Sequence, residues 1–141
     1  MITLMVKDIG AGEVPRKAYA NDAGLDLYVS EDCIVWPKSM SDVPLGIAIE
    51  LTGGYVWARI TARSSTYRNH KLQVLEGVID QGYRGPLFVG LINNGWLPRR
   101  IKAGDRVAQL IVHETVPTIV VKVGTLSESI RGERGFGSTG S

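Results

Sequence analysis

Short apolar runs recur along the chain at the spacing of a β-rich fold. β-Branched and aromatic residues dominate them, as pleated and partly buried strands require. The runs cover residues 45–49, 55–60, 87–92, 107–112 and 119–123. Turn sequences rich in glycine and asparagine separate them, at residues 52–54, 93–95 and 103–105. The pattern predicts an all-β fold, arranged as a barrel or a jelly roll.

Two segments depart from this strand pattern. Residues 64–71 favour a turn or two of helix. Residues 127–141 are rich in glycine and serine, and such a segment cannot bury enough apolar surface to order itself. We therefore expect a β-barrel domain over residues 1–126 and a flexible C-terminal segment over residues 127–141. Composition favours a disordered terminus, although glycine-rich backbone around Arg131 and Phe136 could also wrap closely around a ligand.

The composition narrows the class of protein. A chain of 141 residues fits one domain, and its net charge of +2 is too small to argue for nucleic acid as a partner. Cys33 stands alone, which excludes an intramolecular disulfide framework, and His70 and His113 lack a metal-ligand spacing. No apolar run approaches the roughly 20 residues of a membrane helix, and no signal peptide is evident. We expect a cytoplasmic protein, in the host cytoplasm if the gene is viral or from a phage.

Asp80 is the first candidate for chemistry. It follows the apolar pair Val78 and Ile79, and it precedes Gln81 and a glycine, which suggests a carboxylate at the tip of a β-hairpin. Such a carboxylate can orient a water molecule and accept its proton. An ordinary turn aspartate, bonded to its own backbone, is the alternative, and the residues alone favour it.

Other polar residues could bind phosphate. Arg63, Ser64 and Ser65 precede the predicted helix, where they could bind an anion or merely cap the helix. Gln109 lies within an apolar run, as either an interior donor or a solvent-facing residue. Asp26 enters a strand after a turn, and a metal role for it has little support from the residues. The chain has neither a Walker-type phosphate loop nor a dinucleotide fingerprint nor a Gly-x-Ser-x-Gly elbow.

Five segments, in this order, resemble the five sequence motifs of the trimeric dUTPase family. They are residues 23–27, 62–65, 77–85, 104–110 and 131–140, and they span nearly the whole chain. Taken singly, only the third and the fifth are specific. The resemblance implies a homotrimer of jelly-roll β-barrels with exchanged C-terminal segments. It also implies hydrolysis of dUTP to dUMP and pyrophosphate with Mg²⁺, which limits uracil in DNA and supplies dUMP for dTMP synthesis.

The resemblance also implies roles for individual residues. Backbone groups of Gly77, Val78 and Ile79 would bind uracil, and Tyr83 would lie against the deoxyribose and exclude a 2′-hydroxyl. Asp80 would position the water that attacks the α-phosphorus. The phosphate chain would meet a set of polar side chains, namely Arg63, Ser64, Ser65 and Gln109. Asp26 would order waters near Mg²⁺, which phosphate oxygens and water would mainly hold.

The tail would come from a neighbouring subunit and close over the nucleotide. Phe136 would stack on uracil, and the other tail residues at the nucleotide would be Arg131, Gly137, Ser138 and Thr139. The chain departs from the family pattern at Ala62, at Pro86 and at Arg134, where the family often has proline, an acid and glycine. Arg134 adds a charge to the predicted lid.

Two alternatives to dUTP hydrolysis follow from the same resemblance. A dCTP deaminase of the same fold carries a catalytic glutamate ten residues past the aspartate. Gly90 occupies that position here, and no acid stands near it in the sequence. The second alternative is a regulatory protein of this fold that binds another protein, as some viral members do.

Overall fold

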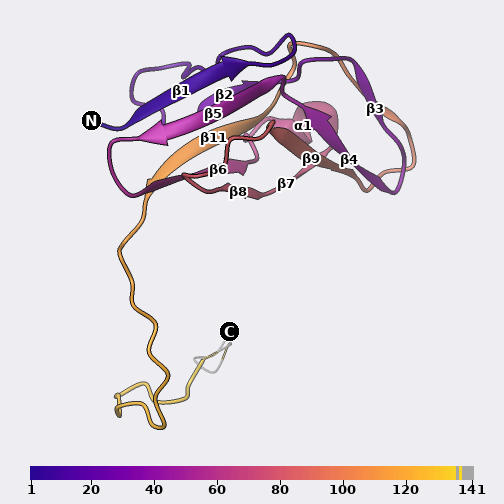
Figure 1. The fold of residues 1–141 in the computed structure, drawn as a ribbon. Helices are drawn as coiled ribbons and strands as arrows, with labels where there is room; N and C mark the ends of the chain where they lie inside the picture. The colour runs from indigo at the N-terminus through magenta and orange to yellow at the C-terminus, as the bar shows by residue number, and fades with distance from the viewer. Residues whose placement is uncertain (136, 138–141) are drawn as a thin grey trace.

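The computed structural model describes residues 1–135 and 137 as a β-rich body with an extended C-terminal segment (Figure 1). One short helix, α1 (Thr66–His70), accompanies the strands in this part of the chain. The strands are β1 (Thr3–Asp8), β2 (Leu25–Tyr28), β3 (Cys33–Val35), β4 (Ser39–Pro44), β5 (Ile47–Thr52), β6 (Val56–Thr61), β7 (Gln73–Leu75), β8 (Gly77–Ile79), β9 (Phe88–Asn93), β10 (Arg99–Ile101) and β11 (Arg106–Glu114). The all-β prediction is confirmed.

The strands form four small antiparallel sheets around one core. The largest has the order β2-β11-β6-β8, and the others are β4-β9-β7, β1-β5 and β10-β3. The strand pairing is thus divided among four sheets, which do not close into one barrel within the described residues. Strand β8 lies at an edge of the largest sheet, where only β6 pairs with it.

Alternation along β6 shows how the sequence makes the core. Val56, Ala58 and Ile60 are at most 3% exposed, whereas Trp57 and Arg59 between them point to the other face. A period of two is the signature of a strand with one buried side. Leucines from the same sheet and from elsewhere in the body complete the core, among them Leu27 of β2, Leu110 of β11, Leu91 of β9 and Leu45 between β4 and β5. Each fully buried leucine contributes about 1.5–3 kcal/mol through removal of apolar area from water.

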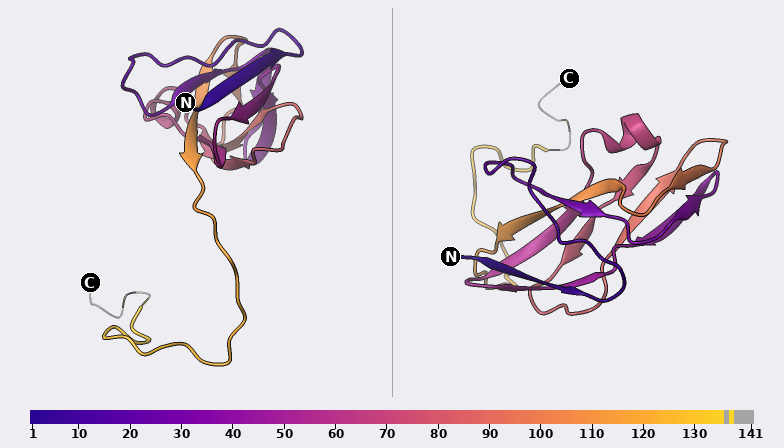
Figure 2. Two further views of the ribbon diagram at one scale, coloured as in Figure 1. Left: turned by 60° about the vertical axis from the view of Figure 1, so that its left-hand side comes forward. Right: turned by 90° about the horizontal axis from the view of Figure 1, so that it is seen from above.

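The predicted strand over residues 119–123 is wrong for the single chain. Strand β11 ends at Glu114, and the following segment runs away from the body without secondary structure (Figure 2). Ile119 and Val120 are 89% and 93% exposed. The apolar pattern is present, but a strand also needs a neighbour for its backbone groups, and the body offers this segment none.

The predicted hairpin at Asp80 is also wrong. Strand β8, which precedes Asp80, pairs with β6, whereas β9, which follows it, pairs with β4 and β7. The two strands therefore belong to different sheets. Asp80 begins a turn in the connection between them, where Tyr83 N donates to Asp80 O at 3.0 Å.

Helix α1 confirms the short helix predicted within residues 64–71. Thr66, its first residue, is buried, and its hydroxyl donates to the carbonyl oxygen of Val107 in β11 at 2.8 Å. This bond fixes the start of α1 against the largest sheet, directly after Arg63–Ser65. No helix in the described residues has the length and apolarity needed to cross a membrane.

Candidate functional site

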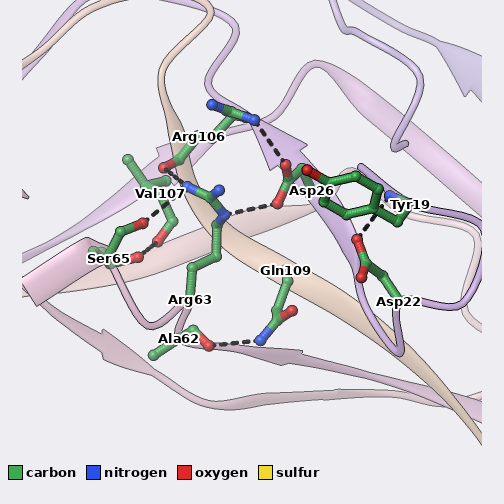
Figure 3. A network of polar contacts seen from close by, with 10 residues as sticks. Tyr19, Asp22, Asp26, Ala62, Arg63, Ser65, Arg106, Val107 and Gln109 are labelled. Carbon is green, nitrogen blue, oxygen red and sulfur yellow. Dashed lines mark hydrogen bonds and ion pairs between the residues drawn. The ribbon is translucent and has the colours of Figure 1, made fainter. Parts of the chain in front are cut away.

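A group of charged and polar side chains gathers where β2, β11 and the end of β6 meet, and we call Asp26, Arg63, Arg106 and Gln109 the polar cluster (Figure 3). Asp26 of β2 lies opposite Gln109 of β11 in the ladder. Arg63 Nε is 2.7 Å from Asp26 Oδ1, and Arg106 Nη1 is 3.1 Å from Asp26 Oδ2. One carboxylate thus holds two guanidinium groups, and the three ionised side chains carry one net positive charge.

Arg63 is held from several sides. Its Nη1 donates to the carbonyl oxygen of Arg106 at 3.2 Å and to Ser65 Oγ at 3.3 Å. Ser65 is the residue before α1, yet its side chain makes no capping bond to the helix. The serine therefore accepts from the arginine, which argues against a purely capping role for it. Ser64 is exposed beside them.

Gln109 completes the cluster. Its amide Nε2 donates to the carbonyl oxygen of Ala62 at 2.9 Å, which leaves Oε1 against Gly24. A Cβ at position 24 would overlap that oxygen, so the Gln109 amide could keep this position only beside a glycine. Asp26, Arg63, Ser64 and Gln109 border one hollow of about 320 Å³. Its donors and its net charge suit a phosphate group.

The second candidate region is the Asp80 turn, which we define as residues 80–85. Tyr83 lies along the turn, and its hydroxyl donates to the carbonyl oxygen of Pro86 at 3.0 Å. A Cβ at Gly85 would strike the Tyr83 ring, so this glycine makes room for the aromatic side chain. The ring is 43% exposed.

Residues 77–79 form the edge strand β8 that leads into the turn. Because β6 pairs with one side of β8 and no strand of the described chain pairs with the other, a row of backbone N–H and C=O groups is open. Open donors and acceptors in alternation can read the edge of a planar base, as a neighbouring strand would. Gly77, Val78 and Ile79 thus lie at an open strand edge, and their role in binding uracil stays a prediction.

Two hollows flank the Asp80 turn. One, of about 330 Å³, is bordered by Asp80, Tyr83, Phe88 and Asp42 among others. The other, of about 530 Å³, lies between the turn and β6 and includes Tyr55, Trp57 and Gln81. The first contains both Asp80 and Tyr83, and we take it as the candidate nucleoside pocket.

Asp42 is a residue that sequence reasoning missed. It lies on β4 opposite Gly90 of β9, and a Cβ built at Gly90 would be 3.6 Å from its Oδ1. No acid is near Gly90 in the sequence, but Asp42 lies beside it in the folded chain. Only the pairing of β4 with β9 could have revealed it. Arg106, Gln81 and Arg84 were likewise missed as partners of the predicted residues.

The polar cluster and the Asp80 turn lie at opposite ends of β6. Ile79 pairs with Ala58, so Asp80 falls beside Trp57, whereas Arg63 is six residues further along the chain. At about 3.3 Å per extended residue, the two regions are roughly 20 Å apart. The structure brings Asp26, Arg63, Ser64, Ser65 and Gln109 together. It does not bring them to Asp80 within one chain.

The tail residues lie elsewhere again. Arg131 sits in the extended segment, where its Nε donates to the carbonyl oxygen of Arg134 at 2.7 Å in a local turn. Gly137 is exposed. Phe136, Ser138 and Thr139, which were predicted to contact the nucleotide, lie outside the described residues.

The chain offers little for a metal ion by itself. No group of three or more histidine, cysteine, aspartate or glutamate side chains among the described residues could hold one. Both oxygens of Asp26 are already paired with arginines. The carboxylate therefore suits an indirect contact to a metal through water better than direct coordination. Cys33 lies apart from both regions, and burial raises the pKa of its thiol, with nearby acids adding to the effect.

Comparison with known proteins assigns the family. A family model described as dUTPase matches residues 11–140. The chain is 42% identical to a deoxyuridine 5′-triphosphate nucleotidohydrolase of Thermobifida fusca over 130 residues, which covers 90% of this chain and 72% of that protein. It is 40% identical to a probable enzyme of the same name from Schizosaccharomyces pombe, with 90% of each chain covered.

A solved structure has the same fold. The dUTPase of Staphylococcus bacteriophage 80alpha, with dUPNHPP, matches with a TM-score of 0.91 at 25% identity, and 99% of each chain is covered. With the family model and these relatives, the chain belongs to the dUTPase family.

Proposed function

We propose that this protein hydrolyses dUTP to dUMP and pyrophosphate. The observation that carries the proposal is the edge strand β8, which leads directly into a turn bearing a carboxylate and an aromatic ring. Open backbone groups of residues 77–79 read the uracil edge. Tyr83 lies against the deoxyribose, where its ring leaves no room for a 2′-hydroxyl.

Asp80 is the catalytic residue of this proposal. Its carboxylate orients a water molecule and accepts a proton from it as the oxygen attacks the α-phosphorus. The bond from that phosphorus to the oxygen bridging toward the β-phosphorus breaks, and pyrophosphate leaves. Arg63, Ser64, Ser65 and Gln109 bind the phosphate chain, where charge develops in the transition state.

In this scheme the substrate, more than the protein, would bind Mg²⁺. A mutant of the dUTPase from phage phi11 of S. aureus coordinates a structural Mg(II) ion. That structure matches with a TM-score of 0.82 at 20% identity, covering 89% of this chain and 99% of that one. Mg²⁺ prefers oxygen ligands and keeps several waters, so triphosphate oxygens would supply most of its shell. Asp26 would contact it through water, and the ion would neutralise phosphate charge.

We further propose that the enzyme is a homotrimer whose sites are shared between chains. The α-phosphorus must lie within a few ångströms of both the Asp80 water and the phosphate donors. Those two regions are roughly 20 Å apart in one chain, which a second copy would resolve by bringing its polar cluster to the first copy's turn. The exposed apolar segment after β11 supports an exchange of C-terminal segments.

The division into a body (residues 1–126) and a lid (residues 127–141) belongs to the same proposal. The lid of one chain would close over a site formed by the other two, with Arg131, Gly137, Ser138 and Thr139 at the nucleotide and Phe136 on uracil. Closure would exclude bulk water as phosphoryl charge develops. The lid proposal predicts that deletion of residues 131–141 leaves the assembly folded but nearly inactive.

Pyrophosphate release is the test of the function. Purified protein with Mg²⁺ should release pyrophosphate from dUTP and act poorly on UTP, dTTP and dCTP. Equal rates on dUTP and UTP would refute the role given to Tyr83, and no release from dUTP would refute the activity.

Asp42 gives a reason to measure ammonia in the same assay. A deaminase would need a carboxylate near the base, and Asp42 borders the candidate nucleoside pocket beside Gly90. Ammonia released from dCTP, and lost in Asp42→Asn, would support that second candidate. We expect none, because the family match and the relatives are to dUTP hydrolases.

A further inference from the structure

We infer that Gln81 and Arg84 are positioning residues that fasten the Asp80 turn to strand β5 and thereby set both turnover and the preference for deoxyribose. The inference rests on the proposed function. It concerns two side chains that contact strand β5 and the backbone of the turn and that hold Asp80 and Tyr83 in place. We call Gln81, Arg84 and Glu50 the turn clamp.

Gln81 joins two sheets. Its Nε2 donates to the carbonyl oxygen of Leu51 at 3.2 Å and to that of Gly54 at 2.8 Å. Leu51 belongs to β5, which pairs with β1, whereas β8 before the turn belongs to the largest sheet. Only the NH₂ end of an amide has two hydrogens to serve two carbonyls, so this orientation of the side chain is fixed by chemistry.

Arg84 closes the turn from its other end. Its Nη1 donates to the carbonyl oxygen of Gln81 at 2.6 Å and to that of Tyr83 at 3.0 Å. Its Nη2 lies 3.1 Å from Glu50 Oε1, again on β5. The guanidinium therefore binds the backbone on both sides of Gly82 while it is itself tied to the neighbouring sheet.

The clamp acts on the two functional side chains together. Asp80 and Tyr83 are linked by the bond from Tyr83 N to Asp80 O, and every contact of the clamp falls between or directly beside them. A turn released from β5 would move both residues relative to the pocket. Since a misplacement of about 1 Å can cost a factor of about 100 in rate, loss of the clamp should lower turnover without removing any catalytic group.

The three members should differ in importance. Arg84 and Glu50 are 48% and 42% exposed at their side chains, and a pair so exposed to water adds little. Gln81 is part-buried and serves two carbonyls, and its bond to Leu51 O is itself part-buried. We therefore rank Gln81 first, the backbone bonds of Arg84 second and the Arg84–Glu50 pair last.

The main experiment compares Gln81→Met with Gln73→Met. Methionine matches glutamine in length but cannot donate, and Gln73 is an exposed glutamine on β7 that provides the matched control. In Gln81→Met, kcat on dUTP should fall about 10- to 100-fold, and the ratio of kcat/KM for dUTP over UTP should fall about tenfold. Tm should stay within a few degrees, and Gln73→Met should behave as the original protein.

A second pair of variants separates the contacts of Arg84. Arg84→Lys keeps the charge beside Glu50 but loses the forked bonds to two carbonyls, whereas Glu50→Gln loses only the ion pair. Arg84→Lys should lower kcat and the dUTP preference about tenfold, and Glu50→Gln should change neither by more than about twofold. The reverse order would overturn the ranking and assign the clamp to the ion pair.

Hydrogen exchange at the Tyr83 amide makes the test independent of activity. Because this amide donates to Asp80 O, its exchange should speed up in Gln81→Met and not in Gln73→Met. Unchanged kinetics and unchanged exchange in Gln81→Met would overturn the clamp. If the original protein released no pyrophosphate from dUTP, the proposed function would fail while the exchange measurement still decided whether the clamp exists.

Discussion

The polar cluster and the Asp80 turn do their work by different physical means. The cluster consists of three charged side chains and one amide, and Asp26 pairs with its two arginines at 2.7 and 3.1 Å. The turn is built from backbone at a sheet edge and is fastened by an amide and a guanidinium. In the proposed function, the first would recognise charge, and the second would recognise shape and a pattern of donors and acceptors.

The two regions differ in what is needed to hold them in their arrangement without a ligand. Two neighbouring guanidinium groups would repel one another, and the carboxylate of Asp26 between them offsets that repulsion. The turn has no comparable repulsion between charges, because open backbone groups at a strand edge are satisfied by water. Substitutions in the cluster should therefore affect phosphate affinity, whereas those in the turn should affect chemistry and selectivity.

The largest expected effect separates chemistry from binding in the turn. Asp80→Asn should lower kcat by about 10²–10⁴, because a positioned general base contributes that much, with little change in affinity for a non-hydrolysable dUTP analogue. Turnover and calorimetric titration of the analogue measure the two quantities. Asp42→Asn is the matched control in the same pocket and should retain kcat within a few-fold. A similar loss in both variants would contradict a special role for Asp80.

The next effect belongs to the cluster. Arg63→Gln removes charge-assisted hydrogen bonds to phosphate, each worth about 1.5–3 kcal/mol, and should raise KM for dUTP about 10- to 100-fold. It should also leave Asp26 with one arginine partner, so some loss of stability is expected. Steady-state kinetics and thermal unfolding check both outcomes. An unchanged KM would place the phosphate chain elsewhere.

Mixing the two variants tests whether the two regions meet between chains. Asp80→Asn and Arg63→Gln subunits, unfolded and reassembled together at equal ratio, should recover roughly a quarter of the original activity. The recovered sites would combine an intact turn from one chain with an intact cluster from another. Each variant reassembled alone provides the baseline. No recovery would mean that turn and cluster of one chain serve the same site.

A smaller effect probes the tyrosine. Tyr83→Phe removes the bond from the hydroxyl to Pro86 O but keeps the ring, so discrimination against UTP should weaken only a few-fold. Gly85→Ala should weaken it more, since the added methyl group collides with the ring itself. Comparison of kcat/KM on dUTP and UTP for both variants gives the ratio. Equal effects would indicate that the hydroxyl, not the ring position, sets selectivity.

The sequence predicted well whatever depends on short-range pattern. Alternation in residues 55–60 predicted β6, and the helix predicted within residues 64–71 is α1. The ordered motifs also singled out Asp26, Arg63 and Gln109, which lie together in the structure, although their roles stay predictions. Their contacts were not predicted, because Arg63 meets Asp26 and Arg106 only after three distant segments pack together.

The failures share one physical cause. Asp80 was expected at a hairpin tip because β8 and β9 are neighbours in sequence, yet they pair in different sheets. Asp42 escaped notice because its nearness to Gly90 arises from a pairing across some fifty residues of chain. The strand over residues 119–123 has the right pattern, but pairing partners decide whether such a pattern becomes a strand.

The exposed apolar segment after Glu114 would make a single, unassembled chain prone to aggregation. Ile119, Val120 and Val121 are consecutive exposed β-branched residues outside any strand, which is the signature of an aggregation-prone stretch. In the proposed homotrimer, newly made chains would need to assemble correctly before these segments pair with each other in the wrong register. The apparent stability of the protein should then rise with its own concentration, so that dilution would act as a mild denaturant.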